Sequence, residues 1–373
     1  MFSVVFFFVS LTLEKKVSKR SYLMVSKKWV RIGKRMSSCV SYHFTKGDPM
    51  KVLDQIGKEN ALKALDEMLL IRNFEQRGEQ GYQAGKVWGF YHAYIGQEAI
   101  QVAAMYAMGR AEHLWVTTYR CHALALLLGM TPKEGLCELY GKANGNAGGR
   151  GGSMHMYTDN MFGGDGIVGG QWGVGAGLAF SLKYRELKNR IAVCFGGDGS
   201  VPQGTFHESM NLAMLWKLPL MVVIENNQLS MGTQLHRSIA NLPIGENVAK
   251  AYGMKCFTVD GMDFCDCFLV FTEAFEWMKK TGEPVIIEAV CHRFRGHSIS
   301  DAANYRSKEE LQKAMERDPL TVFVDYLKTK EFITDAVFEE MKKAKRDEMI
   351  AAMKFADESP FPDINTLEEG VIV

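Results

Sequence analysis

The second half of the chain alternates between short apolar runs and longer segments in which apolar residues recur every three or four positions. The apolar runs predict strands over 191–195, 219–226, 255–260 and 284–294. The longer segments predict helices over 204–217, 246–253 and 268–280. Strands that are apolar at every position are typical of a sheet buried on both faces. We therefore expect an α/β fold with a mostly parallel central sheet and helices on both faces.

The first half predicts further helices and one long loop. Helical spacing of apolar residues covers 59–84 and 95–109, a strand pattern covers 113–119, and a helical run at 121–130 precedes a helix start at Thr131-Pro132. Thirteen glycines lie within 145–177 and are interrupted by large apolar side chains, so this stretch predicts a long ordered loop that leads into a small-residue helix over 173–187. Loops of this length inside compact domains are usually functional. From Lys308 onward the pattern is mostly helical, which predicts a helical C-terminal segment.

Charge separates the first 46 residues from the rest of the chain. Residues 1–46 carry seven lysines, three arginines and one glutamate, a net charge of +9, so the remainder of this 373-residue chain carries −8 of the total of +1. We interpret 1–46 as a basic extension, disordered or derived from a misassigned start, and 47–373 as a single domain. An organelle transit peptide is the alternative. The acidic body argues against nucleic-acid binding, and no apolar stretch reaches the roughly 20 residues that a membrane span needs.

The eight cysteines, at positions 39, 121, 137, 194, 256, 265, 267 and 291, include no Cys-x-x-Cys pair. Cys194 and Cys291 lie inside apolar runs, where cysteine usually acts as a small hydrophobic residue. This pattern favours reduced intracellular thiols over a disulfide or zinc framework.

Polar residues follow two of the predicted strands at the point where each ends. Asp198 stands among Gly196, Gly197 and Gly199, and Asn227 ends the next strand along the chain. If these strands are neighbours, both side chains lie at one sheet edge, where open parallel sheets bind ligands. A carboxylate and an amide oxygen suit Mg²⁺ bridged to phosphates, and glycines let a diphosphate approach the backbone. Alone, the glycine-flanked Asp198 is better explained as a turn residue, and Asn226-Asn227 at the end of the next strand is what favours a binding site.

A Gly-Asp-Gly followed by a strand–helix–strand crossover and Asn-Asn is the pattern of thiamine-diphosphate enzymes. The chain further resembles the alpha subunits of pyruvate dehydrogenase (acetyl-transferring), the thiamine-dependent component of 2-oxo acid dehydrogenase complexes, most closely the bacterial, chlamydial-like members. The resemblance runs from about residue 58 to residue 330. Its motifs are "YHAYIGQEA", "TTYRCHA", "GGRGGSMHMY", "GGDGIVGGQ", "GGDGSVPQGTFHESMNLAMLWKLP", "ENNQLSMGT" and "RFRGHSISD".

The resemblance implies a thiamine-diphosphate-binding fold and roles for individual residues. It assigns Mg²⁺ to the side chains of Asp198 and Asn227 and to the main-chain carbonyl of Leu229. It assigns the remaining cofactor contacts to Tyr119, Arg120, Gly166, Val168, Gly199, Ser200, Gln203 and His297. It also implies catalytic roles for His297, near the reacting centre, and for His92, at the substrate entry. His155 is expected near the site without a defined role, and Trp172 stands where the family more often has a small residue.

The implied reaction is oxidative decarboxylation of pyruvate with reductive acetylation of a lipoyl group on dihydrolipoyl acetyltransferase, which feeds acetyl-CoA synthesis. Partners would be a beta subunit, in a heterotetramer of two alpha and two beta chains that supplies a missing glutamate, and the lipoyl domain. Acetoin or a branched-chain 2-oxo acid is the alternative substrate. A silent nucleotide-binding scaffold and a protein anchored through residues 1–23 are alternatives of other classes. Ser298 matches a phosphorylated serine, but two other regulatory serines are unmatched, which favours a bacterial cytoplasm over the mitochondrial matrix.

Overall fold

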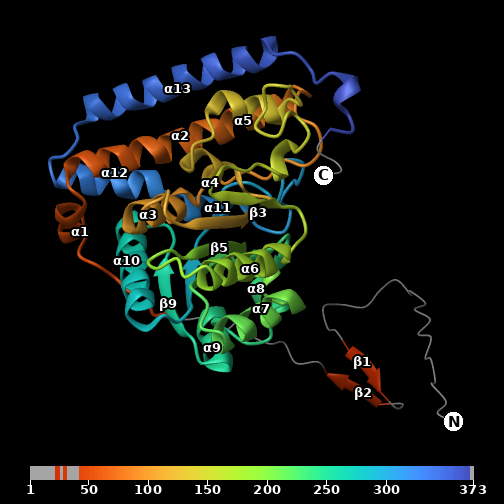
Figure 1. The fold of residues 1–373 in the computed structure, drawn as a ribbon, viewed down its shortest axis with the longest axis vertical. Coiled ribbons are helices and arrows are strands. Elements are labelled where there is room, and N and C mark those ends of the chain that lie inside the picture. The colour runs from red at the N-terminus through yellow and green to blue at the C-terminus, as the bar shows by residue number, and fades with distance from the viewer. Residues whose placement is uncertain (1–21, 26–27, 32–41, 370–373) are drawn as a thin grey trace. The chain divides into compact units, whose positions relative to one another are not determined.

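The computed structural model describes residues 22–25, 28–31 and 42–369, in two units that divide between residues 40 and 41 (Figure 1). The first unit contains an antiparallel hairpin of β1 (Tyr22–Val25) and β2 (Lys28–Arg31). Most of the predicted basic extension lies outside the described residues, so that interpretation stays a prediction. Residues 42–46 belong to the second unit, where the Thr45 N–H donates to the Thr258 carbonyl over 3.0 Å.

The second unit contains a six-stranded sheet in the order β4-β3-β5-β6-β10-β9, and every neighbouring pair in it is parallel. Its strands are β3 (Leu114–Thr118), β4 (Met161–Asp165), β5 (Ala192–Gly197), β6 (Leu220–Asn226), β9 (Lys255–Asp260) and β10 (Val285–Val290). A short antiparallel pair, β7 (Leu229–Ser230) and β8 (Thr233–Gln234), follows β6. The predicted parallel α/β fold is confirmed.

Helices cover both faces of the sheet (Figure 1). They are α1 (Pro49–Ile56), α2 (Lys58–Gln83), α3 (Glu98–Met108), α4 (His122–Leu127), α5 (Pro132–Leu139), α6 (Gly170–Tyr184), α7 (Gly204–Leu215), α8 (Leu235–Ser238), α9 (Ile244–Tyr252), α10 (Phe264–Thr281), α11 (Lys308–Met315), α12 (Pro319–Thr329) and α13 (Asp335–Glu358). Short 3-10 turns lie at Gly152–Met154, Asp198–Ser200 and Ile364–Thr366.

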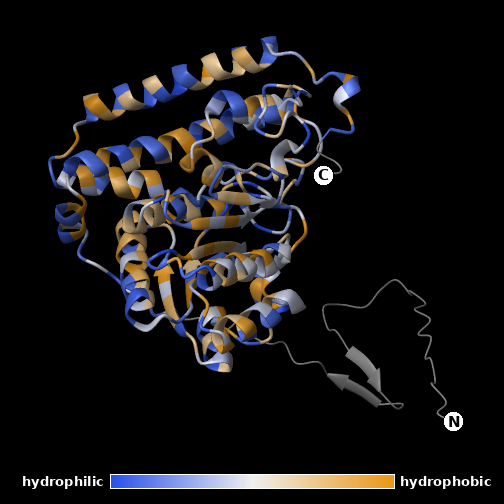
Figure 2. Cartoon of the chain, viewed as in Figure 1, coloured by the Kyte–Doolittle hydropathy of each residue, from blue (hydrophilic) through white to orange (hydrophobic). Residues whose placement is uncertain are grey.

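Alternate residues of the central strands point into two separate hydrophobic cores. On β5, Val193 and Phe195 enter the core shared with α2, α3 and α10, whereas Ala192 and Cys194 enter the core shared with α6, α7 and α9. Successive side chains of a strand point to opposite faces, so a strand between two helical layers must be apolar throughout. Figure 2 shows these strands as largely hydrophobic, whereas the outlying α13 alternates between hydrophobic and hydrophilic residues.

Besides shifts of a few residues at helix ends, such as the start of α10 at Phe264 and of α6 at Gly170, two details differ from the sequence prediction. The strand expected over 284–294 ends at Val290, and β4 lies inside the stretch that was expected to be loop. Met161–Asp165 has a glycine-rich sequence with no strand periodicity, and it is extended because it pairs with the edge of β3. The helix start at Thr131-Pro132 is confirmed: Thr131 and Glu134 form a reciprocal capping box. The seven cysteines among the described residues are all free, in line with reduced thiols.

A buried carboxylate orders the glycine-rich loop. Glu138, at the end of α5, accepts main-chain N–H bonds from Ala147, Gly149, Gly151 and Gly152 at 2.7–2.9 Å. Its side chain is fully buried. Because the loop has few side chains to pack, these four charge-assisted bonds replace a hydrophobic core as the source of its shape.

We expect Glu138→Ala to reduce the free energy of unfolding by about 3 kcal/mol or more, because several buried N–H donors would lose their acceptor. Glu138→Gln keeps one carbonyl oxygen and should lose less. Chemical denaturation measures the loss, and limited proteolysis should show new cleavage within 143–152. The exposed Glu340→Ala is the matched control. Equal stability of the Glu138→Ala and Glu340→Ala variants would contradict this account of the loop.

Candidate active site

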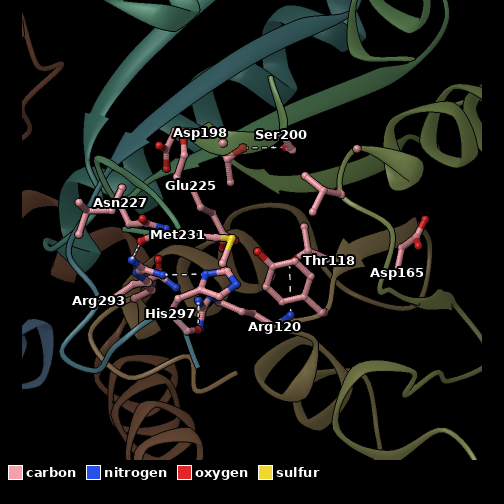
Figure 3. Close-up of a pocket in the computed structure, with 18 of the residues that line it drawn as sticks. Thr118, Arg120, Asp165, Asp198, Ser200, Glu225, Asn227, Met231, Arg293 and His297 are labelled. Atoms are coloured by element: carbon pink, nitrogen blue, oxygen red, sulfur yellow. Dashed lines mark hydrogen bonds between the residues drawn. The ribbon is translucent and has the colours of Figure 1, made fainter. Parts of the chain in front are cut away.

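A cavity of about 250 Å³ lies beyond the carboxyl ends of β3, β5 and β6, beside the segment that follows β10 (Figure 3). Its walls come from segments far apart in sequence. The lining residues are Gln97, Thr118, Tyr119, Arg120, Asp165, Ile167, Val168, Gly169, Gly197, Asp198, Gly199, Ser200, Glu225, Asn227, Leu229, Ser230, Met231, Arg293 and His297. The cavity therefore lies at the sheet edge where the sequence predicted a ligand.

Oxygen atoms without a partner point to a cation at one end of this cavity. Since β5 and β6 pair in parallel, with Gly197 opposite Glu225, the residues that follow them lie side by side. Both carboxylate oxygens of Asp198 and the amide oxygen of Asn227 are buried without a hydrogen-bond partner. Buried polar atoms are almost always satisfied, so these three oxygens fit a group that the protein binds.

The kind of oxygen donor favours a hard cation. Within the described residues, no three His, Cys, Asp or Glu side chains gather as a metal cluster. A metal here would rest on Asp198, Asn227 and main-chain oxygens such as that of Leu229, which also lines the cavity. Carboxylate, amide and carbonyl oxygens, with room for phosphate or water, are the ligands that Mg²⁺ prefers.

Burial makes the ionised form of Asp198 costly. Its residue is only 1% exposed, and desolvation raises the pKa of Asp198 to about 6, although the positive charge of Arg293 opposes the shift. A cation that bound the carboxylate would supply the stabilising charge that the protein itself supplies only in part.

Two buried arginines hold His297 between them. Arg120 donates to the main-chain carbonyls of Ala93 (2.8 Å) and His297 (2.6 Å), and Arg293 contacts His297 Nδ1 (3.2 Å) and donates to the Met231 carbonyl (2.8 Å). Arginine can only donate, so His297 Nδ1 accepts and the ring proton lies on Nε2. Burial, followed by Arg120 and Arg293, lowers the pKa of His297 to about 4. The imidazole is therefore neutral near pH 7, with an Nε2–H available as a donor.

His92 lies next to Tyr119 and His297 but does not itself line the cavity. Its ring centroid is 4.3 Å from that of Tyr119 and 5.0 Å from that of His297. Burial, together with the charge of Arg120, lowers the pKa of His92 to about 2, and its Nδ1 is buried without a partner. Two neutral imidazoles and a phenol thus form one wall beside the cavity.

The chain matches the dehydrogenase E1 component family over residues 66–365. The chain belongs to the dehydrogenase E1 component family. It is 41% identical over 308 residues to a pyruvate dehydrogenase E1 component subunit alpha of Rickettsia felis, covering 82% of this chain and 94% of that protein. It is 38% identical over 348 residues to the subunit of the same name in Rhizobium meliloti, covering 91% and 99%. A mitochondrial type I subunit alpha of Ascaris suum is 39% identical over 341 residues, covering 89% and 85%.

Membership of the dehydrogenase E1 component family implies thiamine diphosphate as the cofactor, and most residues that the sequence assigned to it meet in this cavity. Those that line it are Tyr119, Arg120, Val168, Asp198, Gly199, Ser200, Asn227, Leu229 and His297. Gly166 lies between lining residues without being one of them. Gln203 does not line the cavity, but its side chain packs against Gly169, which does. Their individual roles in this E1 chain remain predictions.

The sequence prediction missed Arg293 and Glu225. The Arg293 Nε is buried without a partner, and Glu225 accepts from the Tyr94 hydroxyl and from Gln101 Nε2. Burial raises the pKa of Glu225 to about 7. Both residues stand next to predicted ones, Arg293 four positions before His297 and Glu225 two before Asn227. Adjacency to a motif was the only signal available, because only the fold shows which neighbours point into the cavity.

His155 and the pair His207-Glu208 lie apart from these contacts. His155 Nδ1 contacts the Gly164 carbonyl at 3.2 Å, and its ring lies beside Gly166. His207 and Glu208 are exposed on α7, and His207 contacts the Tyr252 hydroxyl at 2.9 Å. Both residues therefore lie on the exposed surface of a helix, outside the cavity lining.

We expect Asp198→Asn to stabilise the cofactor-free chain by about 1–3 kcal/mol at pH 7 while abolishing its response to Mg²⁺ and thiamine diphosphate. The folded-state pKa lies above the ordinary value of 3.8, so the unmodified chain loses stability as pH rises from about 4 to about 6. The advantage of the variant should therefore grow over that interval. Thermal midpoints at pH 5 and pH 7, with and without Mg²⁺ and cofactor, measure both effects. If the variant were less stable than the unmodified chain at pH 7, burial of the ionised Asp198 carboxylate would not be the cost that we infer.

Proposed function

We propose that this chain is the alpha subunit of a pyruvate dehydrogenase E1 component. It would carry out thiamine-diphosphate-dependent oxidative decarboxylation of pyruvate and reductive acetylation of the lipoyl group of dihydrolipoyl acetyltransferase. Support comes from relatives of that name in bacteria and in a mitochondrion, which match nearly their whole length. Among the described residues, no helix is both long and apolar enough to cross a bilayer. A bacterial cytoplasm remains the preferred location, with the mitochondrial matrix as the alternative.

The observation that carries the proposal is the set of unpartnered oxygens on Asp198 and Asn227 beside two buried arginines. Hard oxygen ligands next to arginine donors suit a diphosphate bound through Mg²⁺. The Asp198 carboxylate, the Asn227 amide oxygen and the Leu229 carbonyl would hold the metal. The free N–H groups of Arg120 and the Nε–H of Arg293 would face the phosphate oxygens.

Thiamine diphosphate supplies a nucleophilic carbon and an electron sink for loss of carbon dioxide. The protein residues bind and orient around it. Neutral His297 offers its Nε2–H as a donor, and Arg293 and the two main-chain bonds of Arg120 fix the ring's direction. Because most of the charged residues that line the cavity are buried, the low local dielectric strengthens each of these contacts.

A partner chain completes this proposal. Glu225 is the glutamate that lines the cavity, but Tyr94 and Gln101 already bind its Oε1. We therefore keep the prediction that a beta subunit supplies the glutamate that activates thiamine. The lipoyl domain would reach the open side of the cavity.

The exposed face of α6 suits such a partner. Gly173, Val174, Gly177, Phe180 and Tyr184 are exposed along one stripe of the helix. Beside them, the exposed Trp216 lies 5.7 Å from Phe180, between ring centroids. Contiguous exposed apolar side chains mark interaction sites, and small residues on a helix let another helix approach closely. We propose this face as a contact within a heterotetramer of two alpha and two beta chains.

The chain co-expressed with its beta subunit should reduce ferricyanide with pyruvate only when thiamine diphosphate and Mg²⁺ are present. Asp198→Ala should reduce the rate by at least about a hundredfold, because it removes the principal metal ligand. Acetoin and 3-methyl-2-oxobutanoate, assayed in parallel, test the alternative substrates. Turnover of one of these in place of pyruvate would support the proposed cofactor site but contradict the proposed substrate. Absence of activity together with absence of cofactor binding would overturn the proposed function.

Gly177→Leu should prevent assembly while preserving the fold. A Cβ at Gly177 meets no atom within 4 Å, and leucine is about 1 kcal/mol more favourable than glycine inside a helix. The thermal midpoint of the chain should therefore stay the same or rise slightly, while light scattering after size exclusion should show loss of the heterotetramer. Ala336→Leu, on the exposed side of α13, is the matched control. Normal assembly of the Gly177→Leu variant would place the interface elsewhere.

A further inference from the structure

Trp172 occupies the space directly behind the Asp198 segment. It is the third residue of α6, is only 1% exposed, and packs edge-on against Phe206 with 5.1 Å between ring centroids. Its six-membered ring lies so close to Gly196 that a Cβ there would come within 2.2 Å of it. A smaller side chain at position 172 would leave a void behind the end of β5.

The indole nitrogen of Trp172 also binds Ser200. Trp172 Nε1 donates to Ser200 Oγ (3.2 Å), and Ser200 Oγ donates to the Gly197 carbonyl (2.7 Å). A hydroxyl has one hydrogen, and Ser200 has given its hydrogen to Gly197. The hydroxyl therefore has no hydrogen to donate to a phosphate oxygen. Any contact of Ser200 with a diphosphate would come from its main-chain N–H. The Ser200 side chain instead connects Trp172 to the backbone of Gly197.

The link from Trp172 to Ser200 matters because no side chain in the described part of the chain forms a hydrogen bond with the Asp198 carboxylate. Its two oxygens have no hydrogen-bond partner, so their direction depends on the backbone from Gly197 to Ser200. Trp172 flanks that backbone on both sides of Asp198: its ring packs beside Gly196, and its N–H donates to the side-chain hydroxyl of Ser200. The first turn of α6 also follows Val168 and Gly169, which form another wall of the cavity.

We propose that Trp172 is a positioning residue for the cofactor site. Through Ser200 it fixes the segment that carries Asp198, and it couples this segment to the Val168–Gly169 wall, so that both are preorganised for Mg²⁺ and diphosphate. The inference rests on the proposed function. It assigns a role to a tryptophan that the sequence left unexplained.

The test uses the complex with its beta subunit and compares Trp172→Phe, Ser200→Ala and the double variant. Trp172→Phe keeps an aromatic ring and removes the N–H donor, whereas Ser200→Ala removes its acceptor. Calorimetric titration with thiamine diphosphate at fixed Mg²⁺ should show Kd raised about fivefold to tenfold in each single variant. The double variant should be no weaker than the weaker single variant, because both changes break one interaction. kcat at saturating cofactor should change less than Kd.

Trp277→Phe is the matched control. Its indole nitrogen is buried without a partner among the described residues and lies on α10, outside the cavity lining, so its Kd should stay unchanged. A raised Kd for Ser200→Ala with an unchanged Kd for Trp172→Phe would overturn the inference in favour of a direct hydroxyl contact. Additive effects in the double variant, or lower thermal midpoints with unchanged Kd, would overturn it as well. Absence of cofactor binding by the unaltered complex would overturn the proposed function and this inference with it.

Discussion

The rest of the site depends on one constraint, which is that the chain buries the Asp198 carboxylate and, within its described residues, gives it no hydrogen-bond partner. An unsatisfied buried charge costs stability, and a fold retains it only if something else compensates for it. The parallel pairing of β5 and β6 brings the amide oxygen of Asn227 beside it, with Arg293 near enough to oppose the rise in pKa. Together these groups leave three unpartnered oxygens at one end of the cavity, an arrangement that a bound cation would complete.

Two other buried carboxylates in the same unit, unlike that of Asp198, have several hydrogen-bond donors. Glu138 is satisfied by four main-chain donors, and Glu75 accepts from the Tyr91 hydroxyl, the Tyr94 N–H and His122. These networks tie the glycine-rich loop and the loop before α3 to the helical layer of α2 and α5. These two glutamates that shape the protein are thus engaged within it, whereas both oxygens of Asp198, which lines the cavity, have no hydrogen-bond partner among the described residues.

The segment around Asp198 is therefore closely packed on one side and borders an unfilled cavity on the other. Behind Asp198, Trp172 and Phe206 fill the space closely, and the Ser200 hydroxyl is fully engaged. On the other side lie the cavity and the neutral imidazole of His297. These unfilled features suit a bound cofactor, and the close packing behind Asp198 holds its segment in place.

Sequence alone determined the α/β class, most strands and helices, and a site around Asp198 and Asn227, because buried parallel strands need continuous apolar runs and their polar ends must meet at one edge. It could not show that β4 is a strand, since Met161–Asp165 is extended only by pairing with β3. Nor could it show that Arg293 enters the cavity or that Trp172 donates to Ser200. Those contacts join residues distant along the chain, and side-chain direction within a loop has no periodic signal, so only tertiary packing decided them.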